Sequence, residues 1–217
     1  GGGEPADPMA HFAEFARSRG LLGARVGMEV PGFYLSAPQY LGAKKILGDA
    51  LVAEPNGLLG GLRAIKSPRE IEYTRKAAAL SAQALQALIA TVAEGRSELE
   101  LAAAAYHSLL SNGSGLPHST MNLMTGERSA FALGGPTDRR QRMGDTGLVE
   151  IGGNYRRYTS TLGRQWVLGK PTARLSDLYA TVRAASDVCI AKMGPGVPAI
   201  EPHEAAKSVI AAAGLDR

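Results

Sequence analysis

The 217-residue sequence contains one cysteine, Cys189, so no disulfide can form within the chain. No apolar run approaches the ~20 residues that a membrane-spanning helix needs, which excludes a helical span. The first residues, Gly1–Pro5, lack the features of a secretory signal peptide. We therefore expect a reducing, cytoplasmic setting and no contact with a membrane.

Aromatic residues are few, at 6%, and the net charge of +4 is small for the length of the chain. Basic residues are dense only at Arg139, Arg140 and Arg142, and again at Arg156 and Arg157. No aromatic side chains alternate with the first cluster, as a surface that stacks on bases would require. The composition favours a globular protein that does not bind nucleic acid.

The first part of the sequence alternates between strand and helix patterns. Helices are predicted at residues 11–19 and 36–47, and strands at 25–30 and 50–54. This alternation is typical of an α/β unit. The segment is short for a whole domain.

Two helix starts follow the boundary predicted after residue 62. Ser67–Glu70 combines a capping serine, a proline at the first helical position and a glutamate that completes a capping box. Ser97–Glu100 repeats the serine and glutamate of this pattern and opens a helix that ends near Gly113. A mainly helical segment is therefore predicted before Thr120.

From Thr120 onward glycines become frequent and β-type runs appear at residues 148–151 and 158–168. Gly152–Asn154 is predicted to form the turn between these strands. Helices are predicted at 176–193 and 201–213. A strand pair and two helices leave one sheet face uncovered, so we interpret the chain as a piece of a longer protein, cut at both ends.

Several segments, taken in their order and spacing, resemble the creatinase/aminopeptidase-P family, peptidase family M24, whose fold is called pita-bread. These segments are Arg63–Tyr73, Gly95–Glu100, Thr125–Ala130, Pro136–Arg140, Gly144–Asp145 and Met193–Gly196. The resemblance runs from about Arg25 to the end of the chain. It implies that residues 1–62 are the C-terminal half of a creatinase-type N-terminal α/β domain, and that residues 63–217 are the first half of an α+β pita-bread catalytic domain.

Within the family, four segments look most similar to ectoine hydrolases: Val26–Glu29, Tyr34–Ala37, Arg63–Tyr73 and Glu150–Tyr158. That branch opens a small cyclic amidine without a metal, and creatinase cleaves a guanidino compound, also without a metal. The resemblance implies a full-length hydrolase of C–N bonds in a small amidine, guanidino or cyclic amide compound. The family's last histidine and two glutamate ligands would lie beyond Arg217, so this chain alone is expected to be inactive.

The family's metal hairpin carries two acidic ligands, and their positions fall here at Glu150 and Thr161. Eleven residues separate the two positions, a spacing that can place both side chains on one face of a hairpin. Two carboxylates at these positions would bridge two divalent ions and generate a hydroxide. A threonine is a poor ligand for hard cations, so no metal cofactor is expected, with Mn, Co or Zn as the alternative if the site tolerates the change.

Glu150 stands in an apolar strand between Val149 and Ile151, where a carboxylate is costly unless it is exposed, paired or functional. In the ectoine-hydrolase branch the glutamate at this position acts on the substrate. Glu150 is therefore interpreted as nucleophile or general base. The alternative is that it only pairs with Arg156, Arg157 or Arg164.

Leu133 occupies the position where the family commonly has a histidine that shuttles protons or orients substrate. His118, in a loop rich in glycine and proline, is the candidate catalytic substitute, although loop histidines are usually solvated.

Four further residues are candidate substrate contacts: Tyr155, Tyr158, Arg164 and Arg128. The alternative for the tyrosines is packing, and for the arginines an ion pair that holds the structure.

Two other functions stay open. One is a metal-dependent Xaa-Pro aminopeptidase or dipeptidase. The other is a catalytically degenerate member that binds a ligand or a protein, which the combination of Leu133 and Thr161 favours. Members of the family usually form dimers, so a homodimer is expected in each case.

Overall fold

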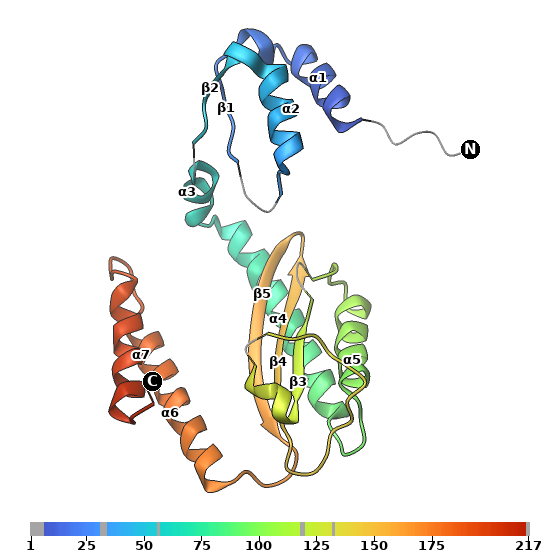
Figure 1. The fold of residues 1–217 in the computed structure, drawn as a ribbon. Coiled ribbons are helices and arrows are strands. Elements are labelled where there is room, and N and C mark those ends of the chain that lie inside the picture. Colours follow the sequence, from blue (N-terminus) through green and yellow to red (C-terminus); the bar gives the residue numbers. More distant parts are fainter. Residues whose placement is uncertain (1–6, 31–33, 56, 118–119, 132, 216–217) are drawn as a thin grey trace, which may run out of the picture. The chain divides into compact units, whose positions relative to one another are not determined.

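The computed structural model describes residues 7–30, 34–55, 57–117, 120–131 and 133–215. The chain divides into two compact units, Gly1–Pro68 and Arg69–Arg217, and the division falls a few residues after the predicted boundary. Both units combine helices and strands (Figure 1).

The first unit contains, in chain order, α1 (Pro8–Ser18), β1 (Val26–Gly27), α2 (Ala37–Leu47), β2 (Leu51–Ala53) and α3 (Leu58–Ala64). Strands β1 and β2 pair in parallel, which requires a crossover, and α2 supplies it. Ser36 is the N-cap of α2, and its backbone N–H donates to Gln39 Oε1 at 3.0 Å. The predicted α/β character of this segment is confirmed.

The second unit contains, in chain order, α4 (Pro68–Thr91), α5 (Glu98–Ser111), β3 (Asn122–Thr125), β4 (Thr146–Tyr155), β5 (Tyr158–Val167), α6 (Ala173–Lys192) and α7 (Ile200–Ala212). The three strands form an antiparallel sheet in the order β3-β4-β5. Helices α6 and α7 pack along each other. The capping box predicted at α5 is present: Glu100 N donates to Ser97 Oγ at 3.1 Å, and Ser97 N donates to Glu100 Oε2 at 2.8 Å.

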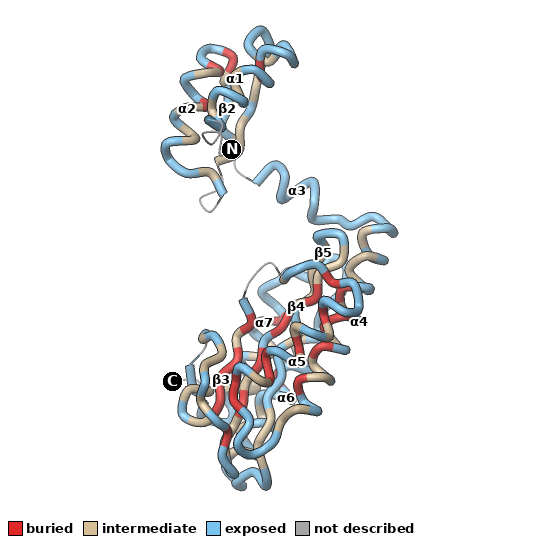
Figure 2. Tube along the Cα trace, turned by 90° about the vertical axis from the view of Figure 1, so that its right-hand side faces the viewer, coloured by how far each residue is buried: buried red, intermediate tan, exposed pale blue. Residues whose placement is uncertain are grey.

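The core of the second unit lies between one face of the sheet and helices α4 and α5, where the buried segments gather in Figure 2. Burial alternates along β4, so Val149 and Ile151 face the helices while Glu150 is exposed. The helices contribute mainly leucine and alanine to this core: Leu80, Ala84, Leu88, Leu101, Ala105 and Leu109. The alternation places the one acidic residue of the strand on the face that the helices leave open.

The predicted turn at Gly152–Asn154 is wrong, because β4 continues through these residues to Tyr155. The turn is Arg156-Arg157, two residues with φ of 50° and 69°. The glycine at 153 serves a different purpose, since it lets β4 approach α4. The start predicted for α6 at Ser176 is also wrong: Thr172 is the N-cap, and its Oγ1 accepts from Leu175 N at 3.3 Å.

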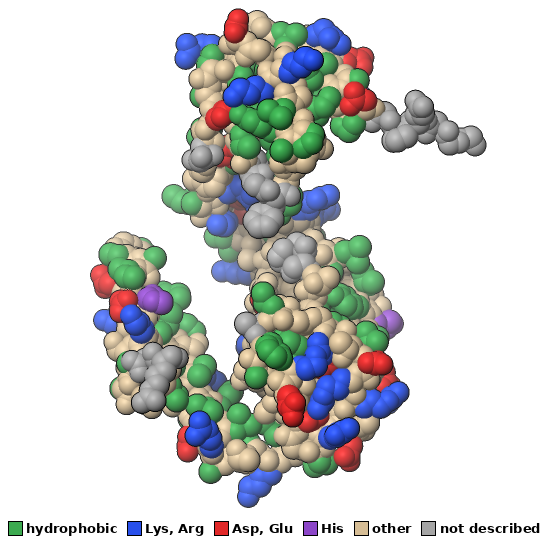
Figure 3. Space-filling view, in the orientation of Figure 1, with side chains coloured by type: hydrophobic (Ala, Val, Ile, Leu, Met, Phe, Trp, Pro, Cys, Tyr) green, Lys and Arg blue, Asp and Glu red, His purple; other side chains and the backbone are tan. Residues whose placement is uncertain are grey.

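The helices and the surface charges of both units also bear on what the described residues can contact. None of their helices is both long and apolar enough to cross a bilayer. Lys and Arg side chains lie beside Asp and Glu on the face shown in Figure 3, without merging into one basic surface. The Arg139 to Arg142 cluster fits this picture, because Arg139 pairs with Asp145 at 2.7 Å and Arg140 with Glu100 at 3.5 Å.

Candidate active site

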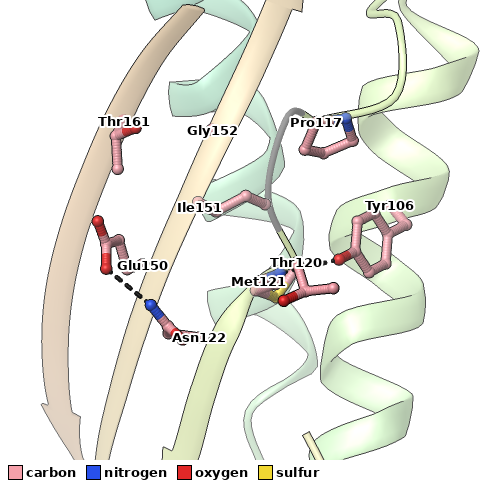
Figure 4. Close-up of a pocket in the computed structure, with 9 residues that line it drawn as sticks. All are labelled: Tyr106, Pro117, Thr120, Met121, Asn122, Glu150, Ile151, Gly152 and Thr161. Atoms are coloured by element: carbon pink, nitrogen blue, oxygen red, sulfur yellow. Dashed lines mark hydrogen bonds between the residues drawn. The ribbon is translucent and has the colours of Figure 1, made fainter. Parts of the chain in front are cut away.

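A small cavity of about 20 Å³ lies where the start of β3 meets β4 (Figure 4). Its lining comes from α5, from the loop before β3 and from all three strands. The lining residues are Tyr106, Pro117, Thr120, Met121, Asn122, Glu150, Ile151, Gly152 and Thr161. A cavity of this size holds about one water molecule, so a larger ligand would have to extend from it over the open sheet face.

Glu150 and Thr161 both line this cavity. The β4–β5 register pairs Glu150 with Gly163 and Gly152 with Thr161. The side chains of Glu150 and Thr161 therefore lie on the same face of the sheet, as diagonal neighbours two residue pairs apart. In Figure 4, Thr161 lies on the side of the Glu150 carboxylate oxygen that points away from Asn122. The predicted geometry of the two family positions is therefore observed.

Glu150 is exposed, so its position in an apolar strand carries no burial penalty. None of the ion pairs among the described residues joins it to Arg156, Arg157 or Arg164. Its contact is with Asn122, whose Nδ2 donates to Glu150 Oε2 at 2.9 Å. The carboxylate is thus held by a neutral amide, and not by an arginine.

Asn122 was not identifiable from the sequence. It opens β3, a strand of four residues that carries no clear alternation and was not predicted. The pairing of Asn122 with Glu150 in the β3–β4 ladder brings the two side chains together. Only long-range strand pairing, which a single sequence does not reveal, makes this residue part of the site.

Ser81 of α4 fixes the β4–β5 hairpin from the helix side of the sheet. Its buried hydroxyl donates to Ser160 O at 2.5 Å and accepts from Gly153 N at 2.7 Å. Gly153 and Ser160 are a cross-strand pair, next to the pair of Gly152 and Thr161 that lines the cavity. One hydroxyl therefore ties both site strands to the helix.

A buried carboxylate, Glu98, anchors β3 and the segment after it. Glu98 Oε1 accepts from Thr125 N at 2.8 Å, and Glu98 Oε2 accepts from Thr137 N at 2.8 Å and pairs with Arg128. Burial by itself disfavours the charged form of Glu98, but the hydrogen bonds from Thr137 and Thr125 outweigh it and lower the pKa. The sequence marked Glu98 only as a residue of a helix start, and its role appears only in the fold.

Tyr155 and Tyr158 lie on the helix side of the sheet, because they differ in strand parity from Glu150. The Tyr73 ring of α4 contacts both, with centroid distances of 5.4 Å and 5.7 Å. Tyr158 Oη donates to Glu70 Oε1 at 2.8 Å. The structure places both tyrosines against α4 and outside the cavity lining.

The remaining predicted site residues also lie outside the lining. Arg164 pairs across the ladder with Val149, on the opposite parity from Glu150, and is exposed. Arg128 is bound to Glu98 and donates to Gly135 O at 3.0 Å. Leu133 is exposed, and His118 lies outside the described residues.

The described residues do not fit a two-metal site. Among the described residues of the lining, Glu150 is the only carboxylate, while Thr161 and Asn122 offer neutral oxygens. Dinuclear sites need bridging anionic oxygens. No group of three His, Cys, Asp or Glu side chains suited to a metal ion occurs among the described residues. The chemistry that these residues support is that of one carboxylate with neutral donors and acceptors.

Comparison with known proteins assigns the chain to a family. The model of metallopeptidase family M24 matches residues 72–217. An Xaa-Pro dipeptidase of Pyrococcus horikoshii is 31% identical over 150 residues, which cover 69% of this chain and 43% of that protein. An ectoine hydrolase of Halomonas elongata is 30% identical over 174 residues, covering 76% and 44%.

The fold gives the same assignment. The crystal structure of the prolidase from Pyrococcus horikoshii matches with a TM-score of 0.85 at 27% identity, over 94% of this chain and 58% of that one. The predicted pita-bread fold is thereby confirmed, and the chain spans about half the length of the curated relatives it matches. Since the family model covers well over half of the chain, including the whole β4–β5 hairpin, the chain belongs to the metallopeptidase family M24.

Proposed function

We propose that the full-length protein hydrolyses a C–N bond in a small amidine, guanidino or cyclic amide compound, with Glu150 as the acting carboxylate. The observation that carries this proposal is the cavity lining, which has one carboxylate and no Lys, Arg or His among its nine residues. A carboxylate beside neutral acceptors suits a planar cationic group such as an amidinium. The free carboxylate of an Xaa-Pro dipeptide would instead need a cation, and the described residues of the lining include none.

Two roles of Glu150 are compatible with this arrangement. As general base, it takes a proton from a water molecule whose oxygen bonds to the planar carbon; the C–N bond then breaks and the proton passes to the leaving nitrogen. As nucleophile, its own oxygen bonds to that carbon, the C–N bond breaks and the leaving nitrogen takes a proton from water; a water molecule then hydrolyses the bond between the carbon and the Glu150 oxygen, which releases the product and restores the carboxylate. The cavity has room for one such water. The hydroxyls of Thr161 and Tyr106 are available to donate to the charge that develops.

A metal-dependent Xaa-Pro dipeptidase is the second candidate, and the name of the family and the dipeptidase relatives favour it. It would need ligands that the described residues do not supply. The metal content of the full-length protein, purified without chelator and measured by plasma mass spectrometry, separates the candidates. One or two Mn, Co or Zn ions per chain, with activation of Xaa-Pro hydrolysis by Mn²⁺, would favour the peptidase.

The substitution Glu150→Gln tests the proposal directly. Turnover of ectoine or creatine by the full-length protein should fall at least ~100-fold, while ligand affinity stays within about tenfold, because the carboxylate acts mainly in the transition state. Glu127→Gln is the matched control, since Glu127 is an exposed carboxylate outside the lining. Turnover that survives Glu150→Gln would contradict the proposal. Ligand binding by the wild-type protein without any product would support a degenerate binding protein instead.

A further inference from the structure

We infer that Asn122 is a positioning residue for Glu150: its amide holds one carboxylate oxygen and leaves the other directed at the substrate. The inference rests on the proposed function, because it assigns the working oxygen of the carboxylate proposed to act. It adds a residue that lies on a different strand from Glu150 and Thr161.

The contact between the two side chains is direct. Asn122 and Glu150 are opposite each other in the β3–β4 ladder, and both line the cavity. Asn122 Nδ2 donates to Glu150 Oε2 at 2.9 Å. Among the described residues, no other side chain forms a hydrogen bond or ion pair with this carboxylate. A glutamate with several rotatable bonds would otherwise be free to swing over the open face.

The two oxygens of Glu150 therefore have different surroundings. Figure 4 shows Oε2 turned to Asn122 and the other oxygen turned to the side of Thr161. The oxygen bonded to the amide has one lone pair engaged, whereas Oε1 is free to take a proton from water or to attack. This asymmetry gives the carboxylate one defined working atom, which proximity catalysis requires.

The backbone on either side of Asn122 is anchored. Met121 N donates to Tyr106 Oη at 3.1 Å, and Leu123 N donates to Gly134 O at 2.9 Å. At the far end of the strand, Thr125 is bound to the buried Glu98 through its N–H and its hydroxyl. β3 is thus fixed to α5 at both ends of the segment that carries Asn122, which keeps the amide in place before substrate arrives.

An amide suits this position chemically. It donates a hydrogen bond without carrying charge, so it orients the carboxylate and leaves its negative charge available to a cationic substrate. An arginine or lysine here would neutralise Glu150, and a leucine would leave it unheld. Asn122→Leu is therefore expected to lower kcat ~10-fold or more, the effect of losing a hydrogen bond to a charged group, with a smaller change in KM.

A double-mutant cycle in the full-length protein tests this coupling, with ectoine and creatine as probes. Asn122→Leu should lower kcat in the wild-type background and have no further effect in Glu150→Gln, because the two residues act as one unit. Asn112→Leu is the control, since Asn112 donates to Ser108 O at the end of α5 and is remote from the cavity lining. If Asn122 had a purely structural role, Asn122→Leu would lower the melting temperature. The factor by which it lowers kcat would then multiply with the factor for Glu150→Gln.

The outcomes separate the inference from the proposed function. If Glu150→Gln lowers kcat at least ~100-fold but Asn122→Leu keeps kcat within twofold of wild type, the inference is overturned and the function stands. If Glu150→Gln retains turnover, the function fails and the inference falls with it.

A readout that needs neither turnover nor an apolar substitution is the side-chain amide signal of Asn122 in ¹⁵N NMR. One amide proton should be shifted downfield and should move in Glu150→Gln. An unshifted signal that ignores this substitution would also overturn the inference.

Discussion

At Gly153 the backbone of β4 comes so close to α4 that a Cβ atom would lie 2.6 Å from Ala77 O and 2.9 Å from Ser81 N. Both contacts are backbone atoms, so a side chain at 153 could fit only if the strand moved away from the helix. Gly153→Ala should therefore lower the free energy of unfolding by ~1–3 kcal/mol, as overpacking does. It should also lengthen the hydrogen bond from Gly153 N to Ser81 Oγ, now 2.7 Å. Urea denaturation of the wild type and of Gly153→Ala measures the change in the free energy of unfolding.

Gly135→Ala is the matched control for this prediction. A Cβ on Gly135 meets nothing within 4 Å, and its φ is not positive. Its free energy of unfolding should stay within about 1 kcal/mol of wild type. Chain entropy alone would favour alanine at both positions, because it restricts the unfolded chain. Equal losses at both glycines would therefore contradict the contact with α4 as the source of the cost at 153.

Residue by residue, the sequence could show only part of the site. Glu150 and Thr161 were recognisable through the resemblance to the family's metal hairpin, and their spacing within one hairpin predicted the shared face that the register shows. Asn122 and Ser81 belong to other elements, and nothing local marks them. The candidate contacts Tyr155, Tyr158 and Arg164 had the right neighbourhood but the opposite parity, which becomes evident only once the register is known.

At the scale of the element, the β4–β5 hairpin closes through an unusual turn. Arg156 and Arg157 both have positive φ, at 50° and 69°, where two-residue hairpin turns favour Asn-Gly. The double substitution Arg156→Asn/Arg157→Gly should raise the free energy of unfolding by about 1 kcal/mol, because asparagine and glycine adopt the left-handed conformation at lower cost than arginine. Thermal and urea unfolding provide the measurement.

Removing two positive charges could stabilise the turn for a different reason. The variant Arg156→Ala/Arg157→Ala removes the same charges but keeps a Cβ atom at both positions, so it should gain little. A gain as large as that of the Asn-Gly variant would attribute the effect to charge repulsion and contradict the conformational explanation.

This turn also shows why the hairpin was only partly predictable. A Gly-Gly-Asn sequence is a strong turn signal, yet tertiary contacts override it. Gly153 is needed against α4, and Asn154 Oδ1 accepts from Arg157 N at 3.0 Å, just before the observed turn. The capping box of α5, in contrast, uses contacts between neighbours in the sequence, and was predicted correctly.

At the scale of the whole molecule, the alternation of elements predicted an α/β first part, and the resemblance of several segments to family M24 implied the pita-bread part that follows. The structural match confirms the fold. The missed element is β3, whose four residues complete the sheet and supply Asn122. Short strands depend on pairing partners far along the chain, here β4, more than on their own composition.

Three acidic residues tie α5, β3 and the loop before β4 together, and they set how the stability of the second unit should vary with pH. Hydrogen bonds from Ser97 and Arg96 lower the pKa of Glu100 to about 2, the Arg139 side chain lowers that of Asp145, and Glu98 is lowered despite its burial. Carboxyls whose pKa is depressed by folding stabilise the folded state above their unfolded pKa and lose that contribution as the pH falls towards the folded pKa. The free energy of unfolding should therefore be constant near neutral pH and should decrease as the pH drops below 4.5 towards about 2. Urea denaturation across this range measures the decrease. A wild-type stability that stays flat or rises on acidification would show that these carboxyls keep ordinary pKa values in the folded protein.

Glu98→Gln should lower the free energy of unfolding by ~3 kcal/mol near neutral pH, since it leaves Arg128 without its ionic partner. It should also make the decrease of stability in acid shallower.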